Sequence, residues 1–333
     1  MSTRSRVAIA DVRSPGEFEE GHIPGAVNLP LFSDSERAQV GTIYKQKGKE
    51  KAIELGLEIV GPKMNLLANK AKTLAVNSKL NVHCWRGGMR SEKMAWLFDL
   101  VGIDTTILIG GYKAYRQQLL DDFQNLDRLI LLQGPTGSGK TKILHELENL
   151  GEQIIDLEHH ARHKGSAFGA LGMEEQPNTA RFQNTLYEDY LKLDPSKRIW
   201  IESESITIGR VYLPQTLWDA MNRSPVIEID LEKKLRTSNI LAEYGHFDHE
   251  LLASSIQKIQ SRFGGDRVKK ALALLEEDRL EELTWLLLEY YDKSYTFSKN
   301  KYKEKEVATF QSENADPLSN AIQLQKIADH LKL

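Results

Sequence analysis

The eight residues from Gly134 to Thr141 constrain the fold more than any other part of this sequence. They fit the phosphate-loop pattern G-x-x-x-x-G-K-[ST] at every position, between an apolar strand at 128–133 and a helix at 142–149. The glycines let successive backbone N–H groups turn toward a phosphate, and the helix N-terminus adds its positive dipole end. This context argues against a chance glycine-rich turn. We predict that phosphate is bound by Gly134, Pro135, Thr136, Gly137, Ser138, Gly139, Lys140 and Thr141.

The loop indicates a pyrophosphate-type ligand more directly than it indicates ATP hydrolysis. Lys140 is expected to contact the terminal phosphate oxygens, and the Thr141 hydroxyl would bind Mg²⁺ if this ion is present. Two predicted strands end in carboxylates, at Asp156 and in the run Glu202-Ser203-Glu204. Neither has the long apolar run of a usual magnesium-binding strand. A magnesium site and a solvated strand end are equally open interpretations, and no other metal site is predicted.

The chain has a single cysteine, Cys84, in the segment His-Cys-Trp-Arg-Gly-Gly-Met-Arg-Ser at 83–91. One cysteine excludes an internal disulfide and a multi-cysteine zinc site. The segment follows a predicted strand and opens a helix, where backbone N–H groups lower the pKa of a thiol. Arg86 and Arg90 add positive charge. We expect this loop to bind an oxyanion and attack it, or to carry sulfur or selenium on the thiol; an inert, buried cysteine is the alternative.

The fold prediction is α/β, with parallel sheets in two domains. Short apolar runs alternate with helical stretches, which favours parallel strands covered by helices. At 333 residues the chain has the length of two domains, and a polar stretch at 121–127 suggests domains at 1–124 and 125–333. The charged segment Ser33 to Lys51 is interpreted as an irregular surface excursion. From Leu231 onward the pattern is mainly helical. Strands are expected at 7–12, 80–83, 105–109, 128–133, 153–157, 198–202 and 226–230.

Composition restricts the setting in which the chain works. No apolar stretch approaches the roughly 18 residues of a membrane span, and no secretory signal is visible, so we expect a cytoplasmic protein without membrane contact. The net charge of −3 argues against a protein that coats polyanions, but it leaves room for a local basic patch. A tRNA or nucleotide partner is compatible with this composition and is not implied by it.

Several other side chains have a functional and a structural interpretation. Three histidines at 159, 160 and 163, and two at 246 and 249, lack the further ligands of a metal site, so a polar surface is favoured. Three arginines in the helical region could close over a phosphate, line a tRNA path or form solvated helix faces. Three tyrosines could stack on a base or a prenyl chain, although their near-helical spacing favours core packing. These residues are Arg236, Arg262, Arg267, Tyr290, Tyr291 and Tyr295.

The segments Asp11 to Phe18 and Gly21 to Asn28 resemble the rhodanese homology domain, a sulfurtransferase fold. The resemblance covers roughly residues 5 to 120. It implies an α/β domain in which Cys84 is the reactive residue. The spacing of five residues between Cys84 and Arg90 is closer to that of cysteine-dependent phosphatases, which share this fold in one family. Sulfur transfer and attack on phosphorus therefore both stay open on the residues alone.

A rhodanese-like segment followed directly by a phosphate loop is similar to the tRNA 2-selenouridine synthase family. The stretches at 109–116, 155–158, 165–169 and 290–295 agree with this resemblance. It implies a transferase that replaces sulfur by selenium in wobble 2-thiouridine of tRNA, with selenophosphate as the donor. It also implies S-geranylation of that sulfur by geranyl diphosphate, as an intermediate step. Cys84 would then transfer selenium, Arg86 and Arg90 would bind the oxyanion, and residues 134–141 would bind diphosphate.

Two other functions stay open at this point. One is a cysteine phosphatase or sulfurtransferase fused to a nucleotide-binding domain, and the other is a non-catalytic module that binds tRNA. The phosphatase would release phosphate from an aryl phosphate, and the binding module would leave the nucleosides of the tRNA unchanged.

Overall fold

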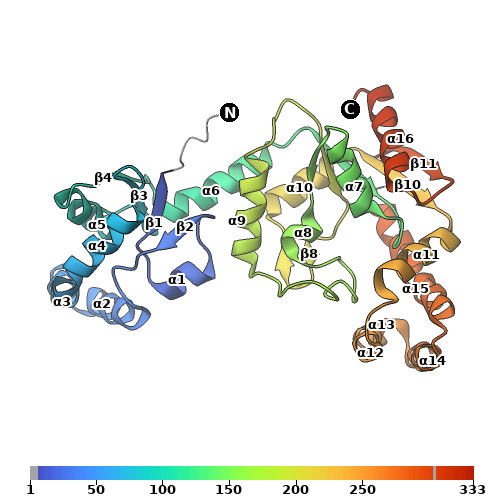
Figure 1. Cartoon of the computed structure of the whole chain (residues 1–333), viewed down its shortest axis with the longest axis horizontal. Helices are drawn as coiled ribbons and strands as arrows, with labels where there is room; N and C mark the ends of the chain where they lie inside the picture. The colour runs from blue at the N-terminus through green and yellow to red at the C-terminus, as the bar shows by residue number, and fades with distance from the viewer. Residues whose placement is uncertain (1–6, 303–304) are drawn as a thin grey trace. The chain divides into compact units, whose positions relative to one another are not determined.

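The computed structural model describes residues 7–302 and 305–333, and the side chains of residues 7–296 and 305–333. The chain forms two compact units, Met1–Asp121 and Asp122–Leu333 (Figure 1). Each unit has its own parallel sheet and its own core. The helix α6 (Gly111–Gln124) begins in the first unit and ends at the start of the second.

The N-terminal unit is built on a parallel sheet of four strands in the order β2-β1-β3-β4. Alternate residues of β1 point to opposite faces: Ala10 packs in the cluster with α4 and α5, and Ile9 packs on the other face near Tyr112. The strands are β1 (Ala8–Asp11), β2 (Ala26–Asn28), β3 (Lys79–His83) and β4 (Asp104–Ile107). The helices are α1 (Pro15–Glu20), α2 (Asp34–Lys47), α3 (Lys49–Val60), η1 (Gly61–Lys63), α4 (Met64–Leu74) and α5 (Met89–Leu100).

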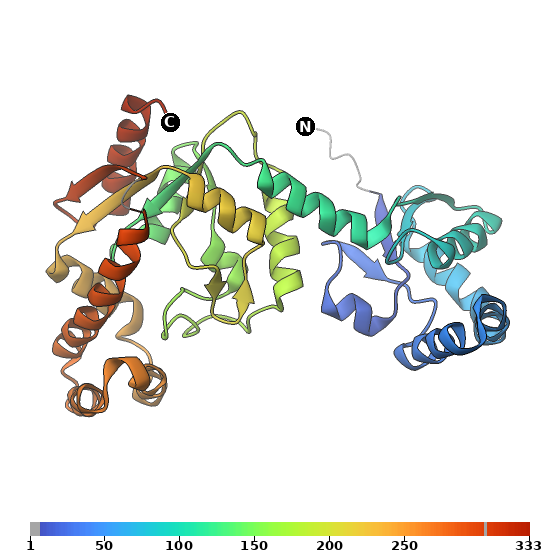
Figure 2. The same ribbon diagram turned by 180° about the vertical axis from the view of Figure 1, so that it is seen from behind.

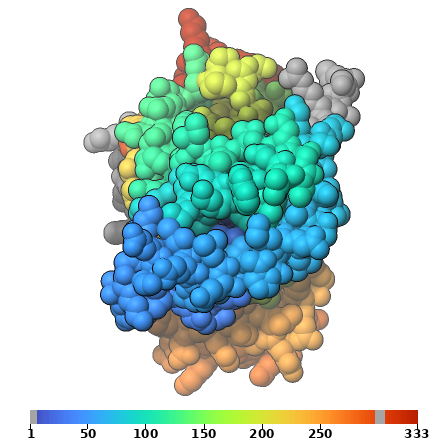
Figure 3. All heavy atoms as spheres, turned by 90° about the vertical axis from the view of Figure 1, so that its left-hand side faces the viewer, coloured from blue at the N-terminus to red at the C-terminus, as the bar shows by residue number. Residues whose placement is uncertain are grey.

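The prediction of an irregular excursion at 33–51 is wrong, because this segment forms α2 and the start of α3. Helix α2 begins with a capping box: Ser33 Oγ accepts from the Glu36 amide at 3.3 Å, and the Glu36 carboxylate accepts from the Ser33 amide at 2.8 Å. No residue of α2 is buried, so there is no apolar stripe to reveal the helix in the sequence. Both helices lie on the face of this unit that is turned to the viewer in Figure 3.

The C-terminal unit contains a parallel sheet of five strands in the order β11-β10-β5-β7-β6. The first strand of the unit, β5, is fully buried between β10 and β7. Consequently the segments that follow β5 and β7 emerge side by side at the same edge of the sheet. The strands are β5 (Leu129–Gln133), β6 (Gln153–Ile155), β7 (Ile199–Glu202), β10 (Val226–Leu231) and β11 (Glu306–Ser312), and β8 (Thr207–Ile208) pairs with β9 (Val211–Tyr212) as a separate antiparallel ribbon.

Helices cover both faces of the second sheet. Two of them share a core cluster with Ile130, Leu132 and Trp200 on one face. Two others, α9 and α10, contact the strands β6 and β5 respectively (Figures 1 and 2). The first pair is α7 (Lys140–Asn149) and α16 (Pro317–His330); the others are α8 (Leu157–Ala161), α9 (Thr179–Tyr190) and α10 (Gln215–Arg223). A further group packs around an apolar cluster beyond β10: α11 (Lys233–Tyr244), α12 (His249–Lys258), α13 (Gln260–Phe263), α14 (Gly265–Glu276) and α15 (Leu280–Tyr302).

The strand β11 departs from the helical prediction for the region after Leu231. It is an edge strand paired only with β10, and its side chains alternate between half-buried and exposed because one face packs toward α16. The rest of the region is helical as predicted. The structure confirms an α/β fold with a parallel sheet in each unit and a helical C-terminal part. Among the helices within residues 7–302 and 305–333, none is long and apolar enough to span a membrane.

Candidate functional site

Cys84 lies between the end of β3 and the start of α5, where it is 4% exposed. Its Sγ is 3.3 Å from the Ser91 hydroxyl oxygen and 3.9 Å from the carbonyl oxygen of Gly88. The Ser91 hydroxyl also lies 2.9 Å from the same carbonyl, to which it donates. Because this hydroxyl has one proton, it can turn from the carbonyl to the sulfur when the thiol is deprotonated. Ser91 is thus a hydrogen-bond donor available to a thiolate, which the sequence analysis did not identify.

The pKa of the Cys84 thiol lies below its ordinary value. Burial alone would raise this pKa, but hydrogen bonds from the Ser91 hydroxyl, from the amides of Ser91 and Arg86, and the charge of Arg90 together outweigh burial. Arg90 is held by Glu17, with 2.7 Å between Nη1 and Oε2. The side chain of Arg86 is exposed. The two predicted arginines therefore differ: Arg90 supplies charge near the sulfur, and Arg86 contributes through its backbone.

The start of α6 fixes the backbone of the cysteine loop. The amide of Tyr112 donates to the carbonyl of Cys84 at 3.0 Å, and the amide of Lys113 donates to that of Trp85 at 2.9 Å. Gly111, with a φ of +58°, lies so close that a Cβ there would collide with the carbonyl oxygen of Cys84. Gly111 therefore permits the close approach that holds the loop in place.

Replacing Gly111 by alanine is expected to lower the free energy of unfolding by about 2 kcal/mol or more, because the methyl group meets the Cys84 backbone and φ is positive. Urea unfolding followed by circular dichroism measures this change. Gly41→Ala is the matched control, since Gly41 lies in α2 with open space around the position of a Cβ. Equal stability of the two variants would contradict this prediction.

A buried ion pair packs against Tyr112, whose amide holds the cysteine loop. The Arg13 guanidinium is 2.5 Å from Asp11 Oδ2, donates to the Gly21 carbonyl at 2.7 Å, and stacks 4.2 Å above the centre of the Tyr112 ring. Both charged side chains are at most 1% exposed. Removing either one would leave the other charge buried and unpaired. The rhodanese-like segment at 11–28 thus helps to hold the cysteine loop in position.

The phosphate loop joins β5 to α7, as predicted, with α7 beginning at Lys140 rather than at 142. Two glycines have positive φ, Gly137 at +83° and Gly139 at +79°. A Cβ at Gly137 would come within 2.9 Å of the Arg236 carbonyl oxygen. Lys140 Nζ donates to the Gly134 carbonyl at 2.9 Å, so its ammonium group lies across the loop. A phosphate within the loop would meet this ammonium directly.

Two residues of α11 donate hydrogen bonds to backbone carbonyl groups of the phosphate loop. The buried Arg236 donates from Nη1 to the Thr136 carbonyl at 3.1 Å and pairs with Asp292 at 2.8 Å. Asn239 donates to the Gly137 carbonyl at 2.9 Å. The interpretation of Arg236 as part of a solvated helix face is wrong, because the side chain is buried and supports the loop backbone. Arg262 and Arg267 are exposed.

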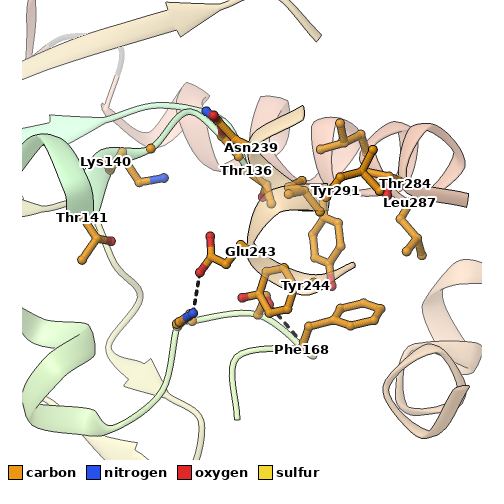
Figure 4. Close-up of a pocket in the computed structure, with 18 of the residues that line it drawn as sticks. Thr136, Lys140, Thr141, Phe168, Asn239, Glu243, Tyr244, Thr284, Leu287 and Tyr291 are labelled. Atoms are coloured by element: carbon orange, nitrogen blue, oxygen red, sulfur yellow. Dashed lines mark hydrogen bonds and ion pairs between the residues drawn. The ribbon is translucent and has the colours of Figure 1, made fainter. Parts of the chain in front are cut away.

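A cavity of about 440 Å³ opens from the phosphate loop into the helical region. Figure 4 shows Lys140 and Thr141 at one end, Phe168, Thr284 and Leu287 at the other, and Tyr244 and Tyr291 between them. The loop end is polar, and the far end is lined by side chains that are mainly apolar. The far end comprises Phe168, Leu252, Leu280, Leu283, Leu287 and Leu288, whereas Ile240 lies beside Gly137 of the phosphate loop.

Carboxylates surround the polar end of the cavity. Glu158 accepts a hydrogen bond from the Thr141 hydroxyl at 2.8 Å, and burial together with the nearby charge of Glu204 raises the pKa of Glu158 to about 7. Glu202 is 1% exposed; its Oε1 accepts from the Glu158 amide at 2.9 Å, while Oε2 has no hydrogen-bond partner among the described residues. Burial and the charges of Asp156 and Glu158 raise the pKa of Glu202. The sequence did not indicate Glu158 as a site residue.

The raised pKa of Glu158 predicts a loss of stability with rising pH. Between about pH 4.5 and about pH 7 the unfolded chain releases this proton and the folded chain keeps it, so the free energy of unfolding falls through that window. The contribution is of the order of 3 kcal/mol. Glu158→Gln should flatten this part of the slope, whereas the exposed control Glu148→Gln should not. Urea unfolding at a series of pH values is the measurement, and identical slopes in both variants would contradict the assignment.

The oxygen atoms at the polar end of the cavity fit a hard cation such as Mg²⁺ only in part. Within the described ranges, no group of three or more His, Cys, Asp or Glu is placed to hold a metal ion. Asp156, one of the predicted candidates, accepts from the His159 amide at 2.8 Å and lies 2.6 Å from His145 Nε2. The unpartnered Oε2 of Glu202 and the Thr141 hydroxyl are the oxygens that suit Mg²⁺, which usually completes its shell with water and phosphate oxygens.

The remaining predicted side chains divide between core and cavity. Tyr291 lines the cavity, whereas Tyr290 packs against Phe263 and Tyr295 donates to Glu228 at 2.7 Å. His160 lies 3.1 Å from Asp189, which is a polar contact.

Two family models match this chain, one within each unit. The family model of the tRNA 2-selenouridine synthase AAA domain matches residues 127–326, and the model of the rhodanese-like domain matches residues 1–118. One solved structure is similar in sequence: the N-terminal domain of a protein from Clostridium difficile 630 that is described as ATP/GTP binding. Its sequence is 44% identical, and the match covers 34% of this chain and 88% of that domain, with a TM-score of 0.33.

Several curated relatives carry the name tRNA 2-selenouridine synthase. The protein of Nitrosomonas europaea is 41% identical over 71% of this chain, and the match covers 63% of that relative, which is less than two thirds of its length. The protein of Bordetella petrii is 37% identical, covering 90% of this chain and 88% of the relative. That of Bdellovibrio bacteriovorus is 36% identical, covering 88% and 89%. These matches extend over both units.

Proposed function

The chain belongs to the tRNA 2-selenouridine synthase family, and on this premise we propose that it replaces sulfur by selenium in the wobble 2-thiouridine of tRNA. Selenophosphate is the selenium donor, and geranyl diphosphate first alkylates the sulfur. The relatives named above support an enzyme that acts on tRNA. The two donor molecules are our proposal, and each is assigned to one of the two loops.

The cavity with one polar and one apolar end is the observation that carries the geranyl step. A prenyl diphosphate has the same division, with a charged diphosphate and a branched hydrocarbon chain. The phosphate loop with Lys140 suits the diphosphate, and the apolar end around Leu283 and Leu287 suits the chain. Burial of the chain in this end contributes binding through the hydrophobic effect.

In the geranyl step the sulfur of 2-thiouridine attacks C1 of the geranyl group. The bond between C1 and the diphosphate oxygen breaks with its electron pair on the oxygen, and the N3 proton of the base passes to water. Lys140 and the loop N–H groups stabilise the charge that develops on the leaving diphosphate. Mg²⁺, held by Thr141 and Glu202, would add positive charge at the same place.

In the selenium step the cysteine loop binds selenophosphate. The amides that point at Sγ and the charge of Arg90 suit a phosphate-like anion, and the lowered pKa of Cys84 favours its thiolate. The Cys84 thiolate attacks the phosphorus of selenophosphate, and the phosphorus–selenium bond breaks with its electron pair on the departing hydrogenselenide. Hydrogenselenide then attacks C2 of the base, the bond between C2 and sulfur breaks, and geranylthiolate leaves as the selenium proton passes to N3. Water releases phosphate from Cys84 and restores the thiolate. This division of labour assigns alkylation to the C-terminal unit and selenium transfer to the N-terminal unit.

Mass spectrometry of tRNA nucleosides tests the proposal. The full chain is incubated with 2-thiouridine tRNA and geranyl diphosphate, with selenophosphate, or with both. We expect S-geranyl-2-thiouridine with the first donor and 2-selenouridine with both. Unchanged 2-thiouridine under every combination would remove the proposal.

A second candidate is a phosphatase reaction at Cys84. The five residues between Cys84 and Arg90, with the Ser91 hydroxyl 3.3 Å from the sulfur, are the observation that favours it. This activity would release phosphate from p-nitrophenyl phosphate and leave tRNA nucleosides unchanged. The same preparation can be assayed for both reactions, so one experiment separates the two candidates.

A further inference from the structure

A lysine lies where the polar and apolar ends of the cavity meet. Lys164 lines the cavity with a side chain that is 28% exposed. Its Nζ is 2.5 Å from Glu243 Oε1, the ion pair drawn as the dashed line at Glu243 in Figure 4, and it lies 5.2 Å from the centre of the Tyr244 ring. In a bound prenyl diphosphate, the bond between the diphosphate and the chain would lie at this junction.

The backbone holds Lys164 firmly in position. Its amide donates to the Gly169 carbonyl at 3.0 Å, and its carbonyl accepts from the Ser166 amide at 2.7 Å. The next residue, Gly165, has a φ of +65°, and a Cβ there would lie 2.7 Å from Glu204 Oε2. The turn therefore packs directly on a carboxylate of the polar end. With the backbone fixed, only the flexible lysine side chain is free to change partner.

The cavity is lined by more acidic residues than lysines. Carboxylates from four residues line it, and these are Glu158, Glu202, Glu204 and Glu243. The ammonium groups that line it belong to Lys140, Lys142 and Lys164. Lys164 comes from the segment after α8, so it reaches the ligand from a different element than the phosphate loop. Its present partner, Glu243, is itself 32% exposed and can be solvated when the lysine leaves.

We propose that Lys164 is a second diphosphate-binding residue, which exchanges Glu243 for the phosphate next to the prenyl chain. The inference rests on the proposed function, because it takes the diphosphate as the ligand of this cavity. An ammonium group on a phosphate oxygen forms a charge-assisted hydrogen bond, and its partner here changes from one carboxylate to a more highly charged anion. Glu243 then has the role of holding Lys164 in the cavity when no diphosphate is bound.

Isothermal titration calorimetry with inorganic pyrophosphate tests this on the full chain. Lys164→Gln should weaken pyrophosphate binding about tenfold or more, and Lys164→Arg should restore part of it. Glu243→Gln should strengthen binding severalfold, because Lys164 no longer has a competing carboxylate. In the double variant most of that gain should disappear. Lys192→Gln, an exposed lysine paired with Asp189 outside the cavity, is the charge-matched control and should bind like the wild type.

The opposite signs expected for the two single variants separate binding from folding. Loss of the ion pair as a structural contact would affect both variants in the same direction, and urea unfolding of each would show it. Wild-type affinity in Lys164→Gln, or no gain in Glu243→Gln, would overturn the inference. Pyrophosphate has no prenyl chain, so a protein that binds it through Lys164 and does not accept geranyl diphosphate would refute the proposed function alone.

Discussion

Replacing Cys84 by serine is expected to abolish selenium transfer while geranylation continues. A serine hydroxyl is far less nucleophilic than the thiolate that the Ser91, Arg86 and Arg90 contacts favour, so the rate should fall by roughly 10³-fold or more. S-geranyl-2-thiouridine should accumulate when both donors are present. The measurement is the rate at which 2-selenouridine forms from S-geranyl tRNA, followed by mass spectrometry of the nucleosides.

The geranylation rate of the same variant is its control. Serine is nearly the same size as cysteine and the loop backbone is anchored by Tyr112 and Lys113, so this unit should fold normally. There is no second cysteine in the chain to take over the reaction. Selenium transfer at the wild-type rate in Cys84→Ser would refute the role assigned to this thiol.

Replacing Lys140 by alanine should slow geranylation and leave selenium transfer intact. Its ammonium group lies across the phosphate loop, where it would stabilise the charge of the departing diphosphate. Removing one such group typically costs about 10²–10³-fold in rate. We therefore expect slow geranylation of 2-thiouridine tRNA by geranyl diphosphate, measured under single-turnover conditions.

The same Lys140→Ala protein should still convert S-geranyl tRNA supplied from outside into 2-selenouridine tRNA. The exposed Lys197→Ala is its charge-matched control and should perform both steps normally. A loss of both steps in Lys140→Ala, with normal folding, would show that the two loops do not act separately. Together the two variants test the division of labour from both directions.

The sequence determined the features that are encoded by neighbouring residues. The phosphate loop was predicted together with its flanking strand and helix because its glycines and its apolar strand lie within one continuous stretch. The same holds for the cysteine loop between β3 and α5. In both cases the backbone conformation depends on local residues, and the pattern of one segment is sufficient to predict it. The missed helix α2 shows the limit, since it has a capping box but no buried face.

Only the tertiary structure decided what surrounds these loops. Glu158, Lys164 and Tyr244 line the same cavity as the phosphate loop although they follow it by many residues, and Leu252 and Leu287 come from still later helices. Hydrophobic periodicity shows that a helix face is buried, but it does not show against which element it packs. Arg236 could not be distinguished from a surface residue for the same reason, because its partner Asp292 lies on another helix. The loops were therefore set by the sequence, whereas the cavity and its charges arise from the packing of distant segments.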